Sequence, residues 1–154
     1  MQGSAKVIGA LNHLLVGELA ARDQYFIHSR MYEDWGYGKL FERIEHEMQE
    51  ETEHAAWLIR RILFLGGTPA MVPSALNIGS DVPSMMKSDL ELEYQVVRDV
   101  RAAMGTCEQE HDYVSRDILL KMLDDTEMDH ARWLEQQLRH IDQMGLENYL
   151  QSKI

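Results

Sequence analysis

All three prolines of this 154-residue chain, Pro69, Pro73 and Pro83, lie in one short stretch that also contains Gly66 and Gly67. Proline and glycine interrupt helices and strands, so this stretch is predicted to be one long connection. The segments on either side contain no proline and are rich in Leu, Met, Ala, Glu, Gln and Arg, which favour helix. The chain is therefore predicted to consist of helices on both sides of a single long linker.

Local signals divide the two segments into helices. Gly36 and Gly38 separate the first two, Asp81 is a predicted N-cap with a proline in the first turn, and Gly145 ends the fourth. Ser115 is the predicted cap of that fourth helix. The apolar residues repeat at helical spacing in every segment, not in the alternation typical of strands. The predicted helices cover residues 5–35, 39–65, 81–110, 115–144 and 146–151.

The lengths of the connections predict the topology. A helix of ~27 residues is ~40 Å long, and an extended linker of ~16 residues spans ~50 Å. The long linker can therefore return along the whole bundle, which leaves the second and third helices parallel, while the short turns make antiparallel hairpins. This is the connectivity of a ferritin-like bundle. We expect an all-α four-helix bundle with one long crossover and a short C-terminal fifth helix, in a single domain over residues 1–154.

Composition excludes several classes of partner. The chain has 26 acidic and 15 basic residues and a formal charge of −11, which argues against nucleic acid and leaves cations as partners. No apolar run approaches the roughly 18 residues of a membrane helix, and the first residues do not resemble a signal peptide. Cys107 is the only cysteine, so a reducing compartment fits. We therefore expect a cytoplasmic protein with no membrane partner.

Ionisable residues interrupt the apolar faces at matching positions in the two halves of the chain. The first half carries Glu18 and Glu51-x-x-His54, and the second carries Glu93 and Glu127-x-x-His130. Four buried carboxylates without positive partners would be too costly. Residues three apart on a helix project to one side, so each Glu-x-x-His unit can hold one ion. Carboxylate and imidazole together suit iron, manganese or zinc, and the six residues are predicted to hold a pair of divalent ions.

Some residues of this pattern have a plainer interpretation. A third Glu-x-x-His, at Glu108 and His111, has no counterpart in the other half, and we discount it. Glu18 lies one turn from Arg22, so an ion pair within the helix is the alternative to metal binding. Tyr25 either bonds a ligand or packs in the core.

His46, Glu47 and Glu50 either hold iron one turn before the ligands of the second helix or form a solvated polar face. The remaining histidines have no partner pattern and are predicted to be surface or interface residues. They are His13, His28, His111 and His140.

The doubled pattern resembles the ferroxidase ligands of the bacterioferritins and bacterial ferritins. Other stretches also resemble this family over the whole chain: Gly17-Glu18-Leu19, Gln24-Tyr25-Phe26, 61–65 (RILFL), 76–79 (LNIG), 112–117 (DYVSRD) and 145–150 (GLENYL). The resemblance implies that Glu51 and Glu127 bridge two irons, with Glu18 and His54 completing one and Glu93 and His130 the other. It also implies a homo-oligomeric shell of 24 subunits. Such a shell oxidises Fe(II) with dioxygen or peroxide and stores ferric mineral.

One position departs from the haem-binding members of that family. They carry a methionine directly after the bridging glutamate of the second helix, and two such methionines from two subunits ligate one haem. Here that residue is Thr52, whose hydroxyl is a poor replacement for a thioether. The chain therefore resembles the haem-free type, or one subunit of a mixed shell whose partner supplies the methionine.

Two other functions compete with iron storage. A di-iron oxidase or peroxidase acting on peroxide or an organic substrate would use the same ligands, but no rubredoxin-like Cys-x-x-Cys segment is present. A helical assembly module whose buried carboxylates are only structural would handle no iron. A DNA-protecting mini-ferritin is disfavoured because the chain has no basic tail and the ligands lie within one bundle.

Overall fold

The computed structural model describes residues 1–154 and contains helices but no strand. The helices are α1 (Ala5–Asp34), α2 (Gly38–Phe64), α3 (Val82–Gln109), α4 (Tyr113–Asp125), the π-helix η1 (Thr126–Ala131), α5 (Arg132–Met144) and α6 (Leu146–Gln151). Three of them, α4, η1 and α5, follow one another without a break and together form the fourth helix of the bundle. The predicted all-α four-helix bundle with a short fifth helix is confirmed.

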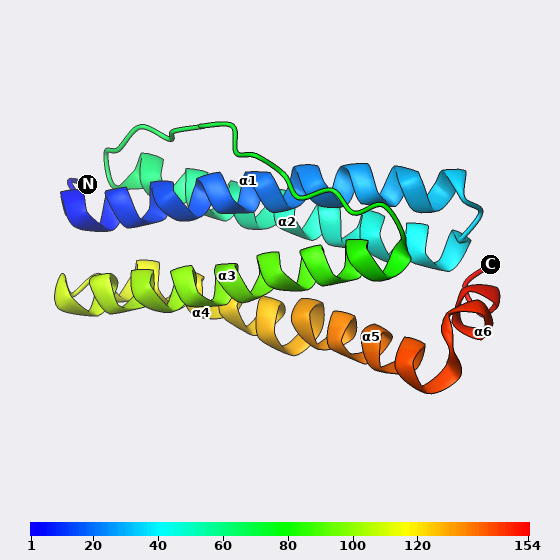
Figure 1. Ribbon diagram of the computed structural model, residues 1–154. Helices are drawn as coiled ribbons and strands as arrows, with labels where there is room; N and C mark the ends of the chain where they lie inside the picture. Colours follow the sequence, from blue (N-terminus) through cyan, green and yellow to red (C-terminus); the bar gives the residue numbers. More distant parts are fainter.

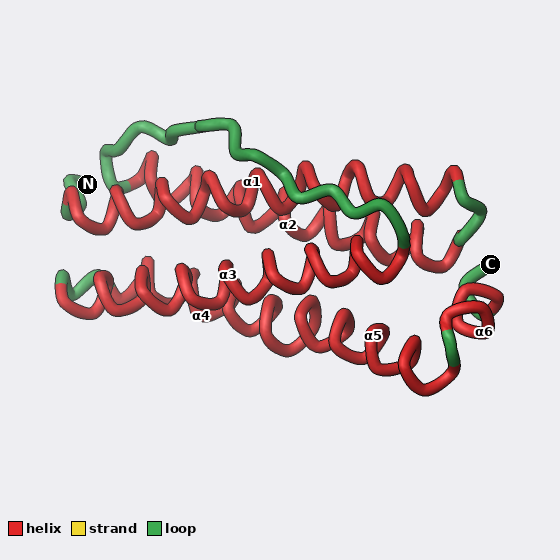
Figure 2. The backbone as a smooth tube through the Cα atoms, in the orientation of Figure 1, coloured by secondary structure: helices red, strands yellow, loops and turns green.

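The two hairpins are joined as the connection lengths predict. In Figure 1, α1 and α2 lie antiparallel as one hairpin, and α3 lies antiparallel to the helix formed by α4, η1 and α5. Residues 65–81 run beside α1 along the bundle, from the end of α2 to the start of α3 (Figure 2). This segment is the predicted crossover, and it leaves α2 and α3 parallel.

Polar side chains hold the crossover to the bundle. The side chain of Asn12 donates to the carbonyl of Thr68 and accepts from the N–H of Ala70. Further along, the N–H of Asn77 donates to Gln24 and the N–H of Gly79 donates to Nε2 of His28. The loop is therefore tied to α1 at both ends of its path.

Helix starts follow the capping residues, with one correction. Asp81 caps α3 in a capping box with Ser84, as expected. The cap of α4, however, is Asp112, which accepts from the N–H and the hydroxyl of Ser115. The prediction of Ser115 as the cap is therefore wrong by three residues, because the aspartate carboxylate reaches the free N–H groups of the first turn. His111, with φ of 56°, supplies the reversal before it.

The apolar core is divided into two clusters. One contains Leu11, Leu58 and Val100 with their neighbours, and the other contains Tyr25, Ile44 and Met86 with theirs. On every long helix, the residues between the two clusters include the predicted metal ligands. The buried ligands therefore form a polar layer across the middle of the bundle.

Three exposure predictions fail. Phe26 and Leu120, placed on core faces by their spacing, are 49% and 43% exposed. His28, expected at the surface or at an interface, is completely buried. It lies beside Asp89, with Nδ1 2.9 Å from Oδ1 of that carboxylate, so a partner on another helix accounts for its burial.

No helix of this chain has the length and apolar character needed to cross a membrane.

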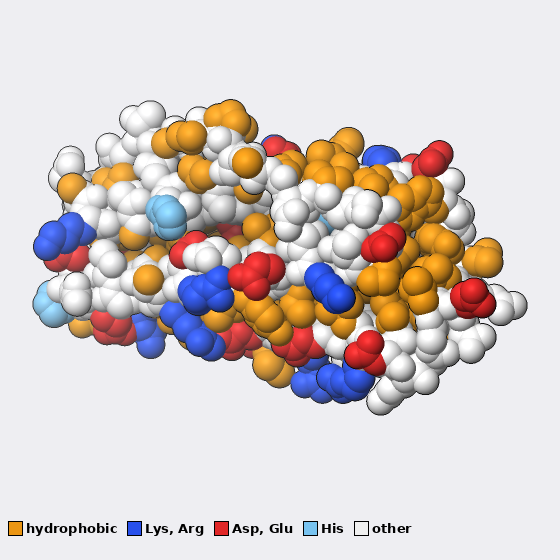
Figure 3. All heavy atoms as spheres, viewed as in Figure 1, with side chains coloured by type: hydrophobic (Ala, Val, Ile, Leu, Met, Phe, Trp, Pro, Cys, Tyr) orange, Lys and Arg blue, Asp and Glu red, His pale blue; other side chains and the backbone are white.

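Figure 3 shows hydrophobic side chains gathered on one face near the end of α1. Phe26 and Ile27 in the second half of α1 and Trp35 directly after it are exposed.

Candidate metal centre

The first group of candidate ligands lies between α1 and α2. Glu51 and His54 are one turn apart on α2 and are 1% and 0% exposed, and Glu18 on α1 faces them at 1% exposure. The Nδ1 atom of His54 is 3.6 Å from Oε2 of Glu18 and 3.5 Å from Oε2 of Glu51. One donor atom from each residue lies within 4.8 Å of the others. The alternative partner of Glu18, Arg22, pairs with Asp23 instead.

The second group combines α2, α3 and η1. The Nδ1 atom of His130 is 2.9 Å from Oε1 of Glu51 and 3.5 Å from Oε1 of Glu93. Glu51 thus contributes one oxygen to each group and lies in the position of a bridging carboxylate. The rings of His54 and His130 are stacked, with centroids 6.0 Å apart. Two ligand groups with one shared carboxylate are an arrangement suited to two neighbouring ions.

The facing atoms of both groups are buried and make no hydrogen bond of good geometry, although Nδ1 of His130 lies 2.9 Å from Oε1 of Glu51. They are Glu18 Oε2, Glu51 Oε1, Glu93 Oε2, His54 Nδ1 and His130 Nδ1. Buried polar atoms are rarely left unpaired in a native fold, because each such atom loses its hydration without compensation. Carboxylate oxygens and imidazole nitrogens are ligands of divalent iron, manganese and zinc. The unpaired atoms therefore fit a pair of such ions.

Outer partners orient the two imidazoles. Nε2 of His54 is 2.8 Å from Oδ2 of Asp125, and Nε2 of His130 is 2.6 Å from Oε2 of both Glu47 and Glu50. A carboxylate on one ring nitrogen fixes the orientation of the ring and raises the basicity of the other nitrogen. The Nδ1 atoms are consequently directed at Glu51. Tyr25 donates to Glu93 from the apolar side of the layer, so it bonds a candidate ligand and also packs in the core.

Burial and crowding shift the acidities of this layer. Burial, with Glu51 next to it, raises the pKa of Glu18 well above its usual range. Burial raises the pKa of Glu93, His130 lowers it and the charge of Glu51 raises it again, to about 7 in total. Burial alone would lower the pKa of His54, but Glu18 and Glu51 raise it to about 11.

The two groups at the centre of the layer shift in opposite directions. Burial raises the pKa of Glu51, but the neighbouring Glu18, His130 and His54 lower it below its usual range. Burial lowers the pKa of His130, and four neighbouring glutamates raise it well above its usual range. Without metal, protonated histidines therefore compensate the charge of the carboxylates.

Glu127 is the one predicted ligand that the structure does not bring to the others. Its Oε1 atom is 2.5 Å from Nη2 of Arg101, and its side chain is 35% exposed. The π-helix explains this orientation, because its i→i+5 bonds widen the turn. The buried residues of η1 are Thr126, His130 and Ala131, four and five apart, and Glu127 is rotated away from that face.

The structure also brings in residues that the doubled pattern does not contain. Glu47 is 2% exposed, and with Glu50, Asp129 and His130 it forms a third group of donor atoms within 4.8 Å. Glu47 lies one turn before Glu51 on the buried face, so its spacing offered a signal. The sequence contains no such signal for Asp125, because Asp125 reaches His54 only through the packing of two helices.

The other residues noted in the sequence lie outside this centre. Glu108 pairs with Arg116 and His111 lies beside Tyr113, so the third Glu-x-x-His forms no ligand group. His46 is exposed and lies 2.9 Å from Glu50.

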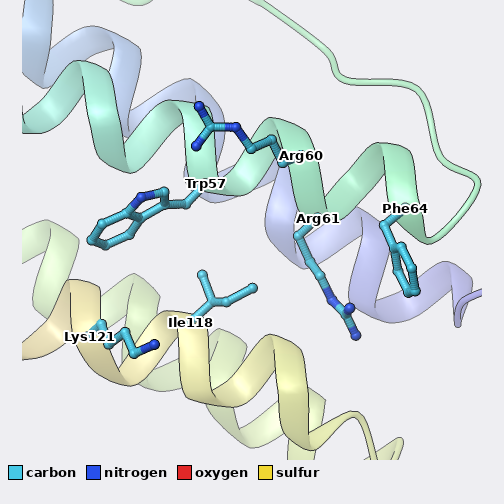
Figure 4. A pocket seen from close by; sticks show the side chains of 6 residues that line it. All are labelled: Trp57, Arg60, Arg61, Phe64, Ile118 and Lys121. Carbon is cyan, nitrogen blue, oxygen red and sulfur yellow. The ribbon is translucent and has the colours of Figure 1, made fainter.

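A surface hollow lies apart from the candidate ligands. It has a volume of about 510 Å³ and opens between α2 and α4 (Figure 4). Side chains from both helices line it: Trp57, Arg60, Arg61, Phe64, Ile118 and Lys121. It approaches the centre only through Trp57, whose ring centroid is 5.1 Å from that of His54. The ligand layer itself is packed inside the bundle.

Comparison with known proteins places the chain in a family. Residues 8–144 match the model of the ferritin-like domain. The chain is 62% identical to a bacterial ferritin of Pseudomonas aeruginosa and 58% identical to one of Neisseria meningitidis, over the full length of both. It is 38% identical to a bacterioferritin of Brucella melitensis, over 97% of this chain and 92% of the relative. The chain therefore belongs to the bacterioferritin and bacterial ferritin family.

Proposed function

We propose that this protein stores iron and oxidises it on entry. Two Fe(II) ions bind as substrate at the centre formed by Glu18, Glu51, His54, Glu93 and His130, with Glu127 as the remaining ligand. Their electrons reduce dioxygen or peroxide, and Fe(III) is deposited as mineral. The observation that carries this proposal is the set of buried, unpaired donor atoms around the shared carboxylate of Glu51.

The chemistry of the donors supports oxidation rather than simple binding. Carboxylates are hard anionic ligands, and they stabilise Fe(III) more than Fe(II). Four ionised glutamates formally balance the charge of two divalent ions, and the attraction between these anions and the ions becomes stronger as the ions lose electrons. Two Fe(II) supply the two electrons that convert dioxygen to hydrogen peroxide, with two protons taken up.

The third ligand group supports a route for the product. Glu47, Glu50 and Asp129 lie on the outer side of His130. Glu47 is buried, whereas the side chain of Glu50 is 32% exposed and that of Asp129 is 48% exposed. Carboxylates of increasing exposure can carry iron from the centre to the surface on which mineral grows.

The surface supports assembly from many copies. Exposed apolar side chains on α1, including Phe26, Ile27 and Trp35, and on the crossover, including Met71 and Val72, are unusual for a chain that acts alone. We propose that copies of this chain cover them in the 24-subunit shell that the family resemblance implies. A shell mixed with a haem-binding subunit uses the same contacts.

Aerobic loading with Fe(II) tests this function. We expect fast growth of ferric absorbance and, after desalting, far more than two irons retained per chain. Glu51→Gln, which keeps the volume and removes the shared anionic ligand, should slow oxidation at least about tenfold, the loss caused even by removing an outer partner of a ligand. Glu53→Gln is the control, because Glu53 is exposed on the same helix and the charge change is equal.

Two results would contradict the proposal. Equal rates for Glu51→Gln and Glu53→Gln would remove the role of the centre in oxidation. Retention that stops at about two irons per chain would exclude storage and favour a di-iron oxidase.

A further inference from the structure

We propose that Arg101 holds Glu127 outside the metal centre and releases it when a second metal ion enters. Arg101 is thus a positioning residue, which acts on metal binding through Glu127. This inference rests on the proposed function, since it assumes that the centre binds two ions. The new point is when Glu127 joins the other candidate ligands, which does not follow from the family resemblance.

The first observation is that Glu127 differs from its equivalent in the other half of the chain. Glu51 and Glu127 occupy the same place in the doubled pattern, each three residues before a buried histidine. Glu51 is 1% exposed and faces both histidines, whereas the side chain of Glu127 is 35% exposed and faces solvent and Arg101. Equivalent positions therefore have opposite orientations.

The second observation is an incomplete ligand group beside Glu127. Glu51 Oε1, Glu93 Oε2 and His130 Nδ1 are buried and make no hydrogen bond of good geometry. His130 lies on η1 with Glu127. An ion held by these three atoms would lack a further anionic ligand, and Glu127 lies three residues before His130, where its counterpart Glu51 lies before His54.

The third observation is the contact that holds Glu127. Arg101 lies on α3, two helical turns beyond Glu93, and Glu127 is its only carboxylate partner. The Arg101 side chain is 63% exposed, and exposed ion pairs contribute little to stability. A divalent ion in the centre can therefore outweigh this pair and draw the carboxylate inward.

The backbone of η1 is suited to such a change. The π-turn places one more residue in the helix than α geometry would, and π-segments of this kind occur frequently at functional sites. Neither Glu127 nor its neighbour Met128 is buried, so the carboxylate can turn without displacing a core side chain. The movement breaks the Arg101 pair and turns the Glu127 side chain, with the π-turn of η1 as the backbone segment that adjusts.

Titration with Co(II), followed by its visible absorption, measures this effect without iron oxidation. Arg101→Met should tighten binding of the second Co(II) by about two- to fivefold, the range expected for losing an exposed ion pair. Arg101→Lys, which can still pair with Glu127, should bind like the wild type. Arg98→Met is the charge-matched control, because Arg98 is also on α3 and pairs with Glu91 instead.

A double-mutant cycle separates the pair from a general charge effect. Glu127→Gln should weaken the second Co(II) site, and adding Arg101→Met to it should then change nothing. The proposal is overturned if Arg101→Met and Arg98→Met bind Co(II) equally, or if Arg101→Met has its full effect in the Glu127→Gln background. Binding of fewer than two Co(II) by the wild type would overturn the proposed function and this inference together.

Discussion

Each candidate histidine ligand lies between inner and outer carboxylates. His54 has Glu18 and Glu51 on Nδ1 and Asp125 on Nε2, and His130 is arranged in the same way with Glu47 and Glu50 outside. Without metal, these rings carry protons that compensate the buried negative charge. A metal ion takes over that compensation, so metal and protons compete for the same nitrogens and oxygens.

This competition predicts the pH dependence of metal binding. The pKa of Glu93 is raised to about 7 and that of His54 to about 11, so both hold protons near neutral pH that a metal must displace. Raising the pH removes these protons in advance, and lowering it adds them. Co(II) affinity should therefore fall as the pH drops from 8 to 6, about tenfold per pH unit for each proton displaced.

Calorimetry in two buffers with different ionisation enthalpies measures the number of protons released. We expect at least one proton for each Co(II) bound at pH 7. His46→Gln serves as the control, since His46 is exposed and lies outside the two ligand groups. A dissociation constant that does not change between pH 6 and 8 would refute this account.

At the residue scale, the sequence predicts which ionisable residues the bundle buries together far better than it predicts their surroundings. The doubled pattern indicates Glu18, Glu51, His54, Glu93 and His130, because helical periodicity alone brings them to buried faces. It does not anticipate the orientation of Glu127, since a π-turn changes which residues share a face and leaves no simple mark in the sequence. The outer carboxylates depend on packing between helices, which periodicity cannot specify.

At the element scale, capping groups account for where helices begin. The predicted break between the third and fourth helices contains neither Gly nor Pro, and the structure makes it with His111 in the left-handed region and Asp112 as cap. Asp112 also lies 2.8 Å from the guanidinium of Arg61 on α2. This carboxylate therefore both starts α4 and joins the two hairpins.

Removal of the Asp112 carboxylate should destabilise the protein. Asp112→Ala removes the acceptor of the Ser115 N–H and one of the two acceptors of the part-buried Arg61, and we expect a loss of about 1–2 kcal/mol in the free energy of unfolding. Chemical denaturation followed by circular dichroism, at one protein concentration, measures it. Asp124→Ala is the control, because Asp124 is exposed on the same helix. Equal stability of the two variants would contradict the role of the cap.

The contacts of Asp112 with Ser115 and Arg61 also make its contribution to stability depend on pH. Burial raises the pKa of Asp112, but bonds from Ser115 and Arg61 lower it more, to below its usual value. A lowered pKa in the folded state means that the contribution is complete above the ordinary Asp value of 3.8 and is lost as the pH falls through the folded pKa. The stability difference between wild type and Asp112→Ala should therefore shrink only in acid.

The crossover shows how a loop can be placed by buried polar groups. Asp89 of α3 accepts from Gln24 and lies beside His28, and these two α1 side chains accept from backbone N–H groups of the crossover. The proline-rich composition predicts the loop but not its path. That path depends on the Asp89 side chain buried between two helices, which a sequence pattern does not reveal.

At the scale of the whole molecule, the two apolar core clusters lie on either side of the layer of buried ionisable residues. The clusters give the bundle its stability, and the ligand layer between them would destabilise it without ions or protons. Iron binding and folding are therefore coupled, since every ion bound relieves unpaired buried atoms. The proposed assembly would add a further level, because copies of the chain would cover the apolar side chains that one chain exposes.

The assembled protein should lack the haem that some family members bind between two subunits. The position of the haem-ligating methionine is Thr52, which is exposed and donates from its hydroxyl to the carbonyl of Met48 at 2.9 Å. The hydroxyl is already bonded to its own helix, and it is a poorer ligand for haem iron than the thioether of methionine.

We expect shells of this chain alone to retain far less than one haem per pair of chains after loading and desalting, measured by Soret absorbance. Thr52→Met should raise retention towards one per pair, whereas Thr52→Leu, with a similar volume and no ligand atom, should not. Stoichiometric haem in the wild-type shell would show that another group serves as the ligand.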